Sequence, residues 1–176
     1  NNETDLFFLE QRFLSYKNAG FFLADVRDRH CLEELFRDVD IVFHAAAYKH
    51  VVLCERSPEE AVQTNILGTQ NVIHAAKNAG VARVVYTSSD KAVNPTNVMG
   101  ASKLMGERLI TAADATSALN GTVFLSVRFG NVLGSRGSVV PIFHQQIKHG
   151  QNITLTDPVM TRFIMSVREA ASLVIN

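Results

Sequence analysis

Short apolar runs alternate with amphipathic segments along the chain. Three runs of strand length, near residues 21–24, 41–46 and 83–87, are continuously apolar. Between and after them, apolar residues recur at helical spacing, most clearly over 58–79 and 98–118. Continuously apolar strands that alternate with helices are typical of a parallel sheet with helices on both faces. The pattern therefore predicts one α/β layer structure without internal repeats or linkers.

Residues that cap helices mark several predicted ends. The run 57–60, Ser-Pro-Glu-Glu, offers an N-cap serine, a proline at the first helical position and a glutamate that can complete a capping box. Gly80 is suited to end the helix that begins there, and Ser166 with Glu169 predicts a second capping box before a final helix. The remaining elements are expected as a first helix that begins at residue 3 and ends near Gly20, as helices over 32–36 and 141–149, and as strands over 123–127 and 153–156.

Composition and charge narrow the class of protein. The 176 residues carry 17 basic and 17 acidic side chains, so there is no net charge and no basic stripe that would favour nucleic acid. Two cysteines, Cys31 and Cys54, do not form a disulfide framework, and no run approaches the roughly 18 apolar residues of a membrane span. The six histidines show no metal-ligand spacing. A cytoplasmic protein without a metal is expected.

Candidate chemistry lies where the predicted strands end. In open parallel sheets, ligands bind at the carboxyl ends of the strands. Asp25, the small residues 45–47, the run 87–91 and the run 128–131 all hold such positions. Each could be an ordinary loop with a helix cap, but together they favour a ligand site at one edge of the sheet.

Five blocks of the sequence carry a family resemblance. The run 88–103, Ser-Ser-Asp-Lys-Ala-Val-Asn-Pro-Thr-Asn-Val-Met-Gly-Ala-Ser-Lys, resembles the active-site stretch of the extended short-chain dehydrogenase/reductases. More narrowly, it is similar to that of the UDP-N-acetylglucosamine 4,6-dehydratases of polysaccharide biosynthesis. The other blocks that resemble this family are 44–51, 65–69, 128–138 and 160–163.

The resemblance implies a fold, a cofactor and a substrate. It implies a Rossmann-like sheet, with residues 1–135 as part of an NAD(P)-binding domain and residues 136–176 as part of the substrate region. The implied reaction uses NAD or NADP and converts a UDP-N-acetylglucosamine-like nucleotide sugar into a UDP-4-keto-6-deoxy sugar. The implied assembly is a homo-oligomer.

One family feature is missing from the sequence. No glycine-rich turn of the kind that receives a dinucleotide pyrophosphate precedes Asp25. In the family this turn lies upstream, so the first two strands and a helix are expected to precede Asn1. We expect the 176 residues alone to bind the cofactor poorly.

The resemblance also implies catalytic roles. Asp90 would be the acid and Lys91 the base on C5, although coupled neighbours make separate assignments unsafe. Ser89 would bind the C4 oxygen. Met99 stands where the superfamily has its catalytic tyrosine, so Asp90 becomes the candidate for the C4 hydroxyl proton, and Lys103 would hold the nicotinamide ribose. Taken alone, Met99 and Lys103 could be a core methionine and a surface lysine one helical turn apart.

Binding roles follow from the same resemblance. Asp25 would accept a hydrogen bond from the adenine amino group, with Val26 beside the ring and Ala45 and Ala46 along the cofactor. Asn65, a poor helix former inside a predicted helix, would support the active-site lysine. The candidate substrate-binding residues are Lys49, His50, Asn131, Arg136 and Arg162.

Two other functions remain open. A nucleotide-sugar 4-epimerase of the same superfamily would return the hydride to C4 and would not need an eliminating pair. A non-catalytic dinucleotide-binding protein or a structural fragment would need neither Asp90 nor Lys91.

Overall fold

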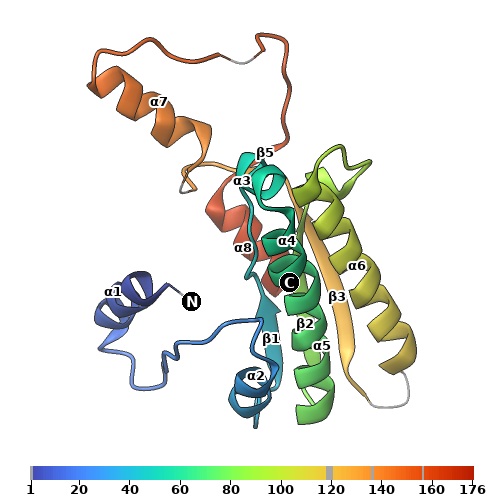
Figure 1. The fold of residues 1–176 in the computed structure, drawn as a ribbon. Helices are drawn as coiled ribbons and strands as arrows, with labels where there is room; N and C mark the ends of the chain where they lie inside the picture. The colour runs from blue at the N-terminus through green and yellow to red at the C-terminus, as the bar shows by residue number, and fades with distance from the viewer. Residues whose placement is uncertain (1, 118–120, 136, 156) are drawn as a thin grey trace.

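A three-stranded parallel sheet forms the centre of the computed structural model, which describes residues 2–117, 121–135, 137–155 and 157–176 (Figure 1). Strands β1 (Ile41–His44), β2 (Arg83–Ser89) and β3 (Val123–Phe129) lie in the order β1-β2-β3. Their register aligns the carboxyl ends of all three strands at one edge of the sheet.

Two long helices cover one face of this sheet. Helices α5 (Gly68–Ala79) and α6 (Val98–Ser117) contact each other and the strands, and Figure 1 shows them side by side. Between them and the sheet, Val84, Tyr86 and Phe124 are buried. The remaining helices are α1 (Glu3–Phe13), α2 (Arg29–Leu35), α3 (Val51–Arg56), α4 (Pro58–Ala61), α7 (Val139–Lys148) and α8 (Val167–Ile175).

The opposite face is covered less completely than predicted. Helix α8 contacts β3 and is seen behind α4 in Figure 1. Ile41 and Phe43 of the edge strand β1 remain 43% and 50% exposed. Leu125 of β3, whose side chain points to the same face of the sheet, is also exposed. The predicted α/β fold class is confirmed, but within the described residues the helices bury mainly one side.

Two of the predicted strands are wrong. Residues 21–24 are extended without a strand partner in the described chain, and Phe22 and Leu23 are exposed. Residues 153–155 likewise form no strand, and residue 156 lies outside the described part. A strand requires a paired neighbour as well as an apolar run. The pairing that does occur joins β4 (Asn131–Val132) to β5 (Ile164–Met165), which the pattern did not predict.

Several helix ends are confirmed, and one cap is corrected. Gly80 ends α5 in the left-handed conformation with φ 70°, and Ser166 and Glu169 form the predicted capping box at α8. Ser57 makes no side-chain cap at α4, and its backbone N–H donates to the Leu53 carbonyl at the end of α3. The first helix ends at Phe13, well before the predicted end near Gly20.

The long helix predicted from residue 58 contains a π-helical turn, η1 (Val62–Leu67), between α4 and α5. Such single-turn π-bulges are frequent at functional sites. This turn carries Asn65, whose side chain points to neighbouring elements rather than to solvent. None of the helices in the described part of the chain has the length and apolar character needed to cross a lipid bilayer.

Candidate functional site

Three adjoining hollows line the edge where the strands end. The Asp25 hollow, of about 560 Å³, is lined by Asp25, Val26 and residues 45–47. The Lys103 hollow, of about 490 Å³, is lined among others by Ala45, Ala47, Ser89, Lys91, Met99, Lys103 and Asn131. The Asp90 hollow, of about 630 Å³, contains Asp90, Lys91 and Arg162. The first two share Ala45 and Ala47, so they adjoin along the sheet edge.

Asp90 and Lys91 form an ion pair directly after β2. They lie in a 3₁₀ turn, η2 (Asp90–Ala92), which Ser89 caps by accepting the Lys91 backbone N–H. Lys91 Nζ lies 3.0 Å from Asp90 Oδ1, and the Ser89 hydroxyl donates to the same oxygen over 2.9 Å. Lys91 Nζ also donates to Asn131 Oδ1 over 3.1 Å. The structure therefore brings four predicted site residues into one cluster.

The cluster has a defined charge distribution. Burial raises the pKa of Asp90, but hydrogen bonds from Lys91 and Ser89 and the lysine charge outweigh this effect, so the net pKa lies below its ordinary value. Asp90 is therefore a carboxylate at neutral pH. With the Ser89 hydrogen directed at Asp90, the pair stands as a carboxylate acceptor beside an ammonium donor.

Lys103 lies deep in α6 beneath the end of β2. Its side chain is 6% exposed, and Nζ donates to the Thr87 carbonyl over 2.8 Å while lying 4.8 Å from the centre of the Tyr86 ring. Burial lowers its pKa to about 8, opposed by the charge of Glu107. Met99 is also buried, one turn earlier. The surface-lysine interpretation is therefore wrong for Lys103.

Asn65 holds the loop after β1 against α6. Its Oδ1 accepts the Tyr48 backbone N–H over 2.8 Å, and its Nδ2 donates to the Tyr48 carbonyl and to Ser102 Oγ. Ser102 adjoins Lys103 in the sequence, so Asn65 connects the 45–50 loop to the helix that carries the buried lysine. Its predicted support of the lysine is therefore indirect in this structure.

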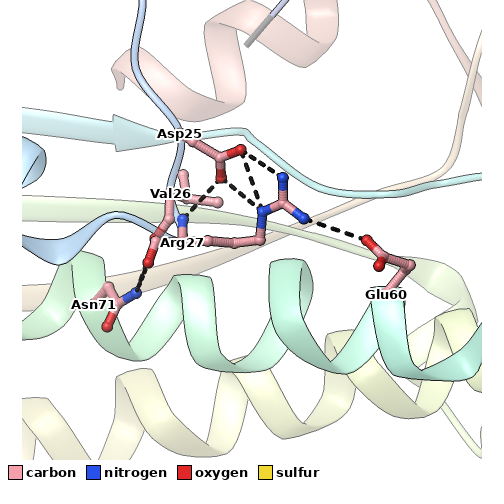
Figure 2. A network of polar contacts seen from close by, with 5 residues as sticks. All are labelled: Asp25, Val26, Arg27, Glu60 and Asn71. Atoms are coloured by element: carbon pink, nitrogen blue, oxygen red, sulfur yellow. Dashed lines mark hydrogen bonds and ion pairs between the residues drawn. The ribbon is translucent and has the colours of Figure 1, made fainter.

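Figure 2 shows how Asp25 is held. The Arg27 guanidinium forms an ion pair with the Asp25 carboxylate at 2.8 Å, and the Arg27 backbone N–H donates to Oδ1. Hydrogen bonding from Arg27 lowers the pKa of Asp25 to about 2. Arg27 also reaches Glu60 at 3.3 Å, and Asn71 Nδ2 donates to the Val26 carbonyl at 3.0 Å. These contacts fasten the Asp25 segment to the helices beneath it.

The predicted substrate-binding residues lie less close together. Lys49 lines the Lys103 hollow and, together with His50, a second hollow of about 260 Å³ beside α3. Arg162 borders both the Lys103 and Asp90 hollows and donates to the Thr161 carbonyl over 2.8 Å. Arg136 lies outside the described residues.

Sequence reasoning missed an ion pair beside the site in which the carboxylate is buried and the guanidinium is half exposed. Glu107 of α6 is 8% exposed and binds Arg128 of β3 through two hydrogen bonds of 2.8 and 2.7 Å. The bond from Arg128 lowers the pKa of Glu107. The sequence contained a signal for the position of Glu107. It follows Lys103 by four residues, so both side chains lie on one face of the helix.

The histidine in β1 is structural. His44 is 4% exposed, and its Nε2 lies 3.0 Å from Thr69 Oγ1. Because the Thr69 hydroxyl donates its hydrogen to the Asn65 carbonyl, His44 is the donor. Burial, with a smaller effect of the Lys103 charge, lowers its pKa to about 4. Among the described residues, no group of three potential ligands gathers to bind a metal.

Comparisons with known proteins give the relatives of this chain. The model of a family described as polysaccharide biosynthesis protein matches residues 1–176. The chain is 53% identical over 174 residues to the Uncharacterized membrane protein MJ1061 of Methanocaldococcus jannaschii, covering 99% of this chain and 52% of the relative. It is 48% identical over 162 residues to a UDP-glucose 4-epimerase of Rickettsia canadensis, covering 92% of this chain and 48% of the relative. The chain spans about half the length of these relatives.

A further relative is the probable polysaccharide biosynthesis protein EpsC of Bacillus subtilis. It is 52% identical over 155 residues, covering 87% of this chain and 25% of the relative. The chain thus shares its sequence with part of a considerably longer protein.

Solved structures resemble the fold. Pen from Bacillus thuringiensis has a TM-score of 0.97 at 48% identity, covering 99% of this chain and 54% of that one. The dTDP-glucose 4,6-dehydratase DesIV of Streptomyces venezuelae, with NAD bound, has a TM-score of 0.84 at 23% identity over 92% of this chain and 55% of that one. UDP-glucose 4-epimerase of Thermus thermophilus, in complex with NAD, has a TM-score of 0.75 at 25% identity, covering 91% of this chain and 61% of that one. These likenesses confirm the predicted Rossmann-like fold.

Proposed function

Because the chain belongs to the polysaccharide biosynthesis protein family, we propose that the protein is an NAD- or NADP-dependent 4,6-dehydratase of a UDP-N-acetylhexosamine. The Asp90–Lys91 ion pair carries this proposal. Elimination of water requires one group that accepts a proton and one that donates a proton, and these two side chains lie 3.0 Å apart at a strand end. In this proposal residues 1–135 supply the cofactor side and residues 136–176 part of the substrate side.

The residues present fit part of a nicotinamide dinucleotide. The Asp25 hollow has an acceptor side chain and the small residues 45–47, which leave room for a flat ring near the backbone. The Lys103 hollow has a buried cation suited to ribose hydroxyls. When bound, the dinucleotide would accept a hydride from sugar C4 and return it to C6. The NAD bound in related solved structures of a dehydratase and an epimerase supports this assignment.

Arg27 affects how the adenine end would bind. Its guanidinium and backbone N–H occupy acceptor positions on both Asp25 oxygens. An adenine amino group would use the acceptor positions that remain, with Asp25 already fixed in orientation. The Asn71 contacts to the carbonyls of Val26 and Arg27 keep this segment beside the hollow.

The proton balance of the elimination follows from the ion pair. One proton leaves C5, one proton joins the departing C6 hydroxyl, and the C5–C6 double bond forms as water leaves. In the resting pair Asp90 is the acceptor and Lys91 the donor. The opposite assignment, with Asp90 as acid and Lys91 as base, requires one prior proton transfer from Nζ to Oδ1. Both distributions belong to one coupled pair.

Product analysis tests the proposal. The full-length protein that contains this chain, supplied with NAD or NADP and UDP-N-acetylglucosamine, is expected to release a 4-keto-6-deoxy product. Lys91→Met and Asp90→Asn should each reduce its formation by at least about 100-fold, since acid–base groups contribute about 10²–10⁴-fold. Lys17→Met, at an exposed position after α1, is the matched control. Undiminished elimination by Lys91→Met would contradict the assignment.

A 4-epimerase is the second candidate, favoured by the name of the Rickettsia canadensis relative at 48% identity. An epimerase would return the C4 epimer of the substrate without loss of water. It would also have no elimination step for Asp90 and Lys91 to perform. The same incubation distinguishes the two functions, because mass spectrometry separates an isomer from a product that is lighter by one water.

A further inference from the structure

Asn131 contacts the catalytic cluster from a distant part of the chain. Its backbone is fixed, because its N–H donates to the Phe163 carbonyl over 2.7 Å and it pairs with Ile164 between β4 and β5. The preceding Gly130 allows this approach, since a Cβ there would lie 2.6 Å from the Phe163 carbonyl oxygen. The Asn131 side chain therefore projects from the short ladder that pairs β4 with β5.

The partly buried side chain of Asn131 contacts Lys91. Asn131 Oδ1 accepts from Lys91 Nζ over 3.1 Å, while Asp90 Oδ1 accepts from the same nitrogen over 3.0 Å. Lysine has a flexible four-carbon stem, so a single hydrogen bond leaves its nitrogen free to swing. Two acceptors on separate elements, η2 and β4, hold the nitrogen at a defined position. The Lys91 ammonium has three N–H donors, and two of them bind these acceptors. One donor therefore remains for the substrate.

We propose that Asn131 is a positioning residue for Lys91 and that its amide oxygen, by fixing the Lys91 nitrogen, sets the direction in which the proton is transferred. This inference rests on the proposed elimination at Asp90 and Lys91. It differs from the role predicted for Asn131 as a substrate ligand. A substrate ligand contributes mainly to KM, whereas a positioning residue contributes mainly to kcat.

Steady-state kinetics with Asn131→Ala, Asn131→Asp and the exposed control Asn18→Ala separates the two roles. Asn131→Ala is expected to lower kcat for the 4-keto product by at least about tenfold and to change KM less than about threefold. Asn131→Asp keeps an acceptor at the same position and adds a negative charge. It is expected to retain more of kcat and to move the basic limb of the pH–rate profile to higher pH.

A second measurement does not depend on catalysis. Lys91 is acetylated with acetic anhydride at several pH values, and its labelling is read by peptide mass spectrometry. Asn131→Asp should move the labelling midpoint to higher pH, and Asn131→Ala should change the labelling rate, with Asn18→Ala matching the wild type. This result would hold even if the wild type formed no 4-keto product, which would instead refute the proposed function.

Two outcomes would overturn the inference. One is a tenfold or greater rise in KM for Asn131→Ala with kcat and Lys91 labelling unchanged, which would identify a substrate ligand. The other is wild-type kinetics and wild-type Lys91 labelling in both Asn131 variants. If Asn131→Ala fails to fold, as judged by its thermal unfolding, Asn131→Asp alone still decides through the pH dependence of Lys91 labelling.

Discussion

Replacing Lys103 by Met should stabilise the protein at neutral pH. Burial lowers the pKa of Lys103 from its ordinary 10.5 to about 8. At about 1.4 kcal/mol per pKa unit, keeping this side chain charged in the folded protein costs about 3 kcal/mol at pH 7. The bond to the Thr87 carbonyl is lost in the variant, at about 1 kcal/mol. A net gain of about 2 kcal/mol in the free energy of unfolding is expected, with loss of nicotinamide-dependent turnover.

The pH dependence gives the sharper test of the same substitution. Because the folded pKa of Lys103 lies below the unfolded value, the unfolded chain binds more protons between pH 8 and pH 10.5, and stability rises with pH in this window. Between pH 7 and pH 9 the contribution of Lys103 increases by about 1.4 kcal/mol. The stability difference between wild type and Lys103→Met should shrink by that amount.

Urea unfolding of the wild type and Lys103→Met at pH 7 and pH 9, followed by circular dichroism, measures both effects. Taking the difference between the two proteins cancels the titration of groups that the Lys103 charge does not influence. Lys17→Met, at an exposed position before the first apolar run, is the control and should follow the wild type at both pH values. A difference between wild type and Lys103→Met that stays constant within about 0.3 kcal/mol would refute the burial argument.

Three further perturbations follow from the described contacts. Mainly because burial lowers the pKa of His44 to about 4, the free energy of unfolding of the wild type should fall by about 2 kcal/mol between pH 7 and pH 5 as this group takes up a proton in the unfolded chain. Urea unfolding of His44→Gln should lack this decrease, and an equal decrease in both proteins would contradict the prediction. Gly106→Ala places a Cβ 2.3 Å from Tyr86 Oη and should cost roughly 2 kcal/mol of stability, part of which Tyr86→Phe should restore in the double variant. Asn71→Ala removes the two bonds to the carbonyls of residues 26–27, so hydrogen exchange of that segment should rise about tenfold, with unchanged exchange as the contrary result.

Local chemistry predicted the helix ends better than the strands. Gly80 and the pair Ser166 and Glu169 act through the backbone of their own helix, so their positions are readable from neighbouring residues. Residues 21–24 have the composition of a strand but no paired strand in the described chain. The composition of a segment does not show whether another segment lies beside it to pair with. The same limit applies to β4 and β5, which are too short to have a pattern and exist only through their pairing.

For the site, the sequence by itself determined which groups are adjacent. Ser89, Asp90 and Lys91 are consecutive after a strand, so their clustering follows from their order in the chain. Only the tertiary structure decided that Lys103 is buried and that Asn131, forty residues from Lys91, completes the cluster. Burial and long-range partners depend on how separate elements pack. Packing therefore determines how far the pKa of a lysine is shifted and where its side-chain nitrogen points. The sequence thus specified the candidate acid–base groups, and the fold specified their charge and orientation.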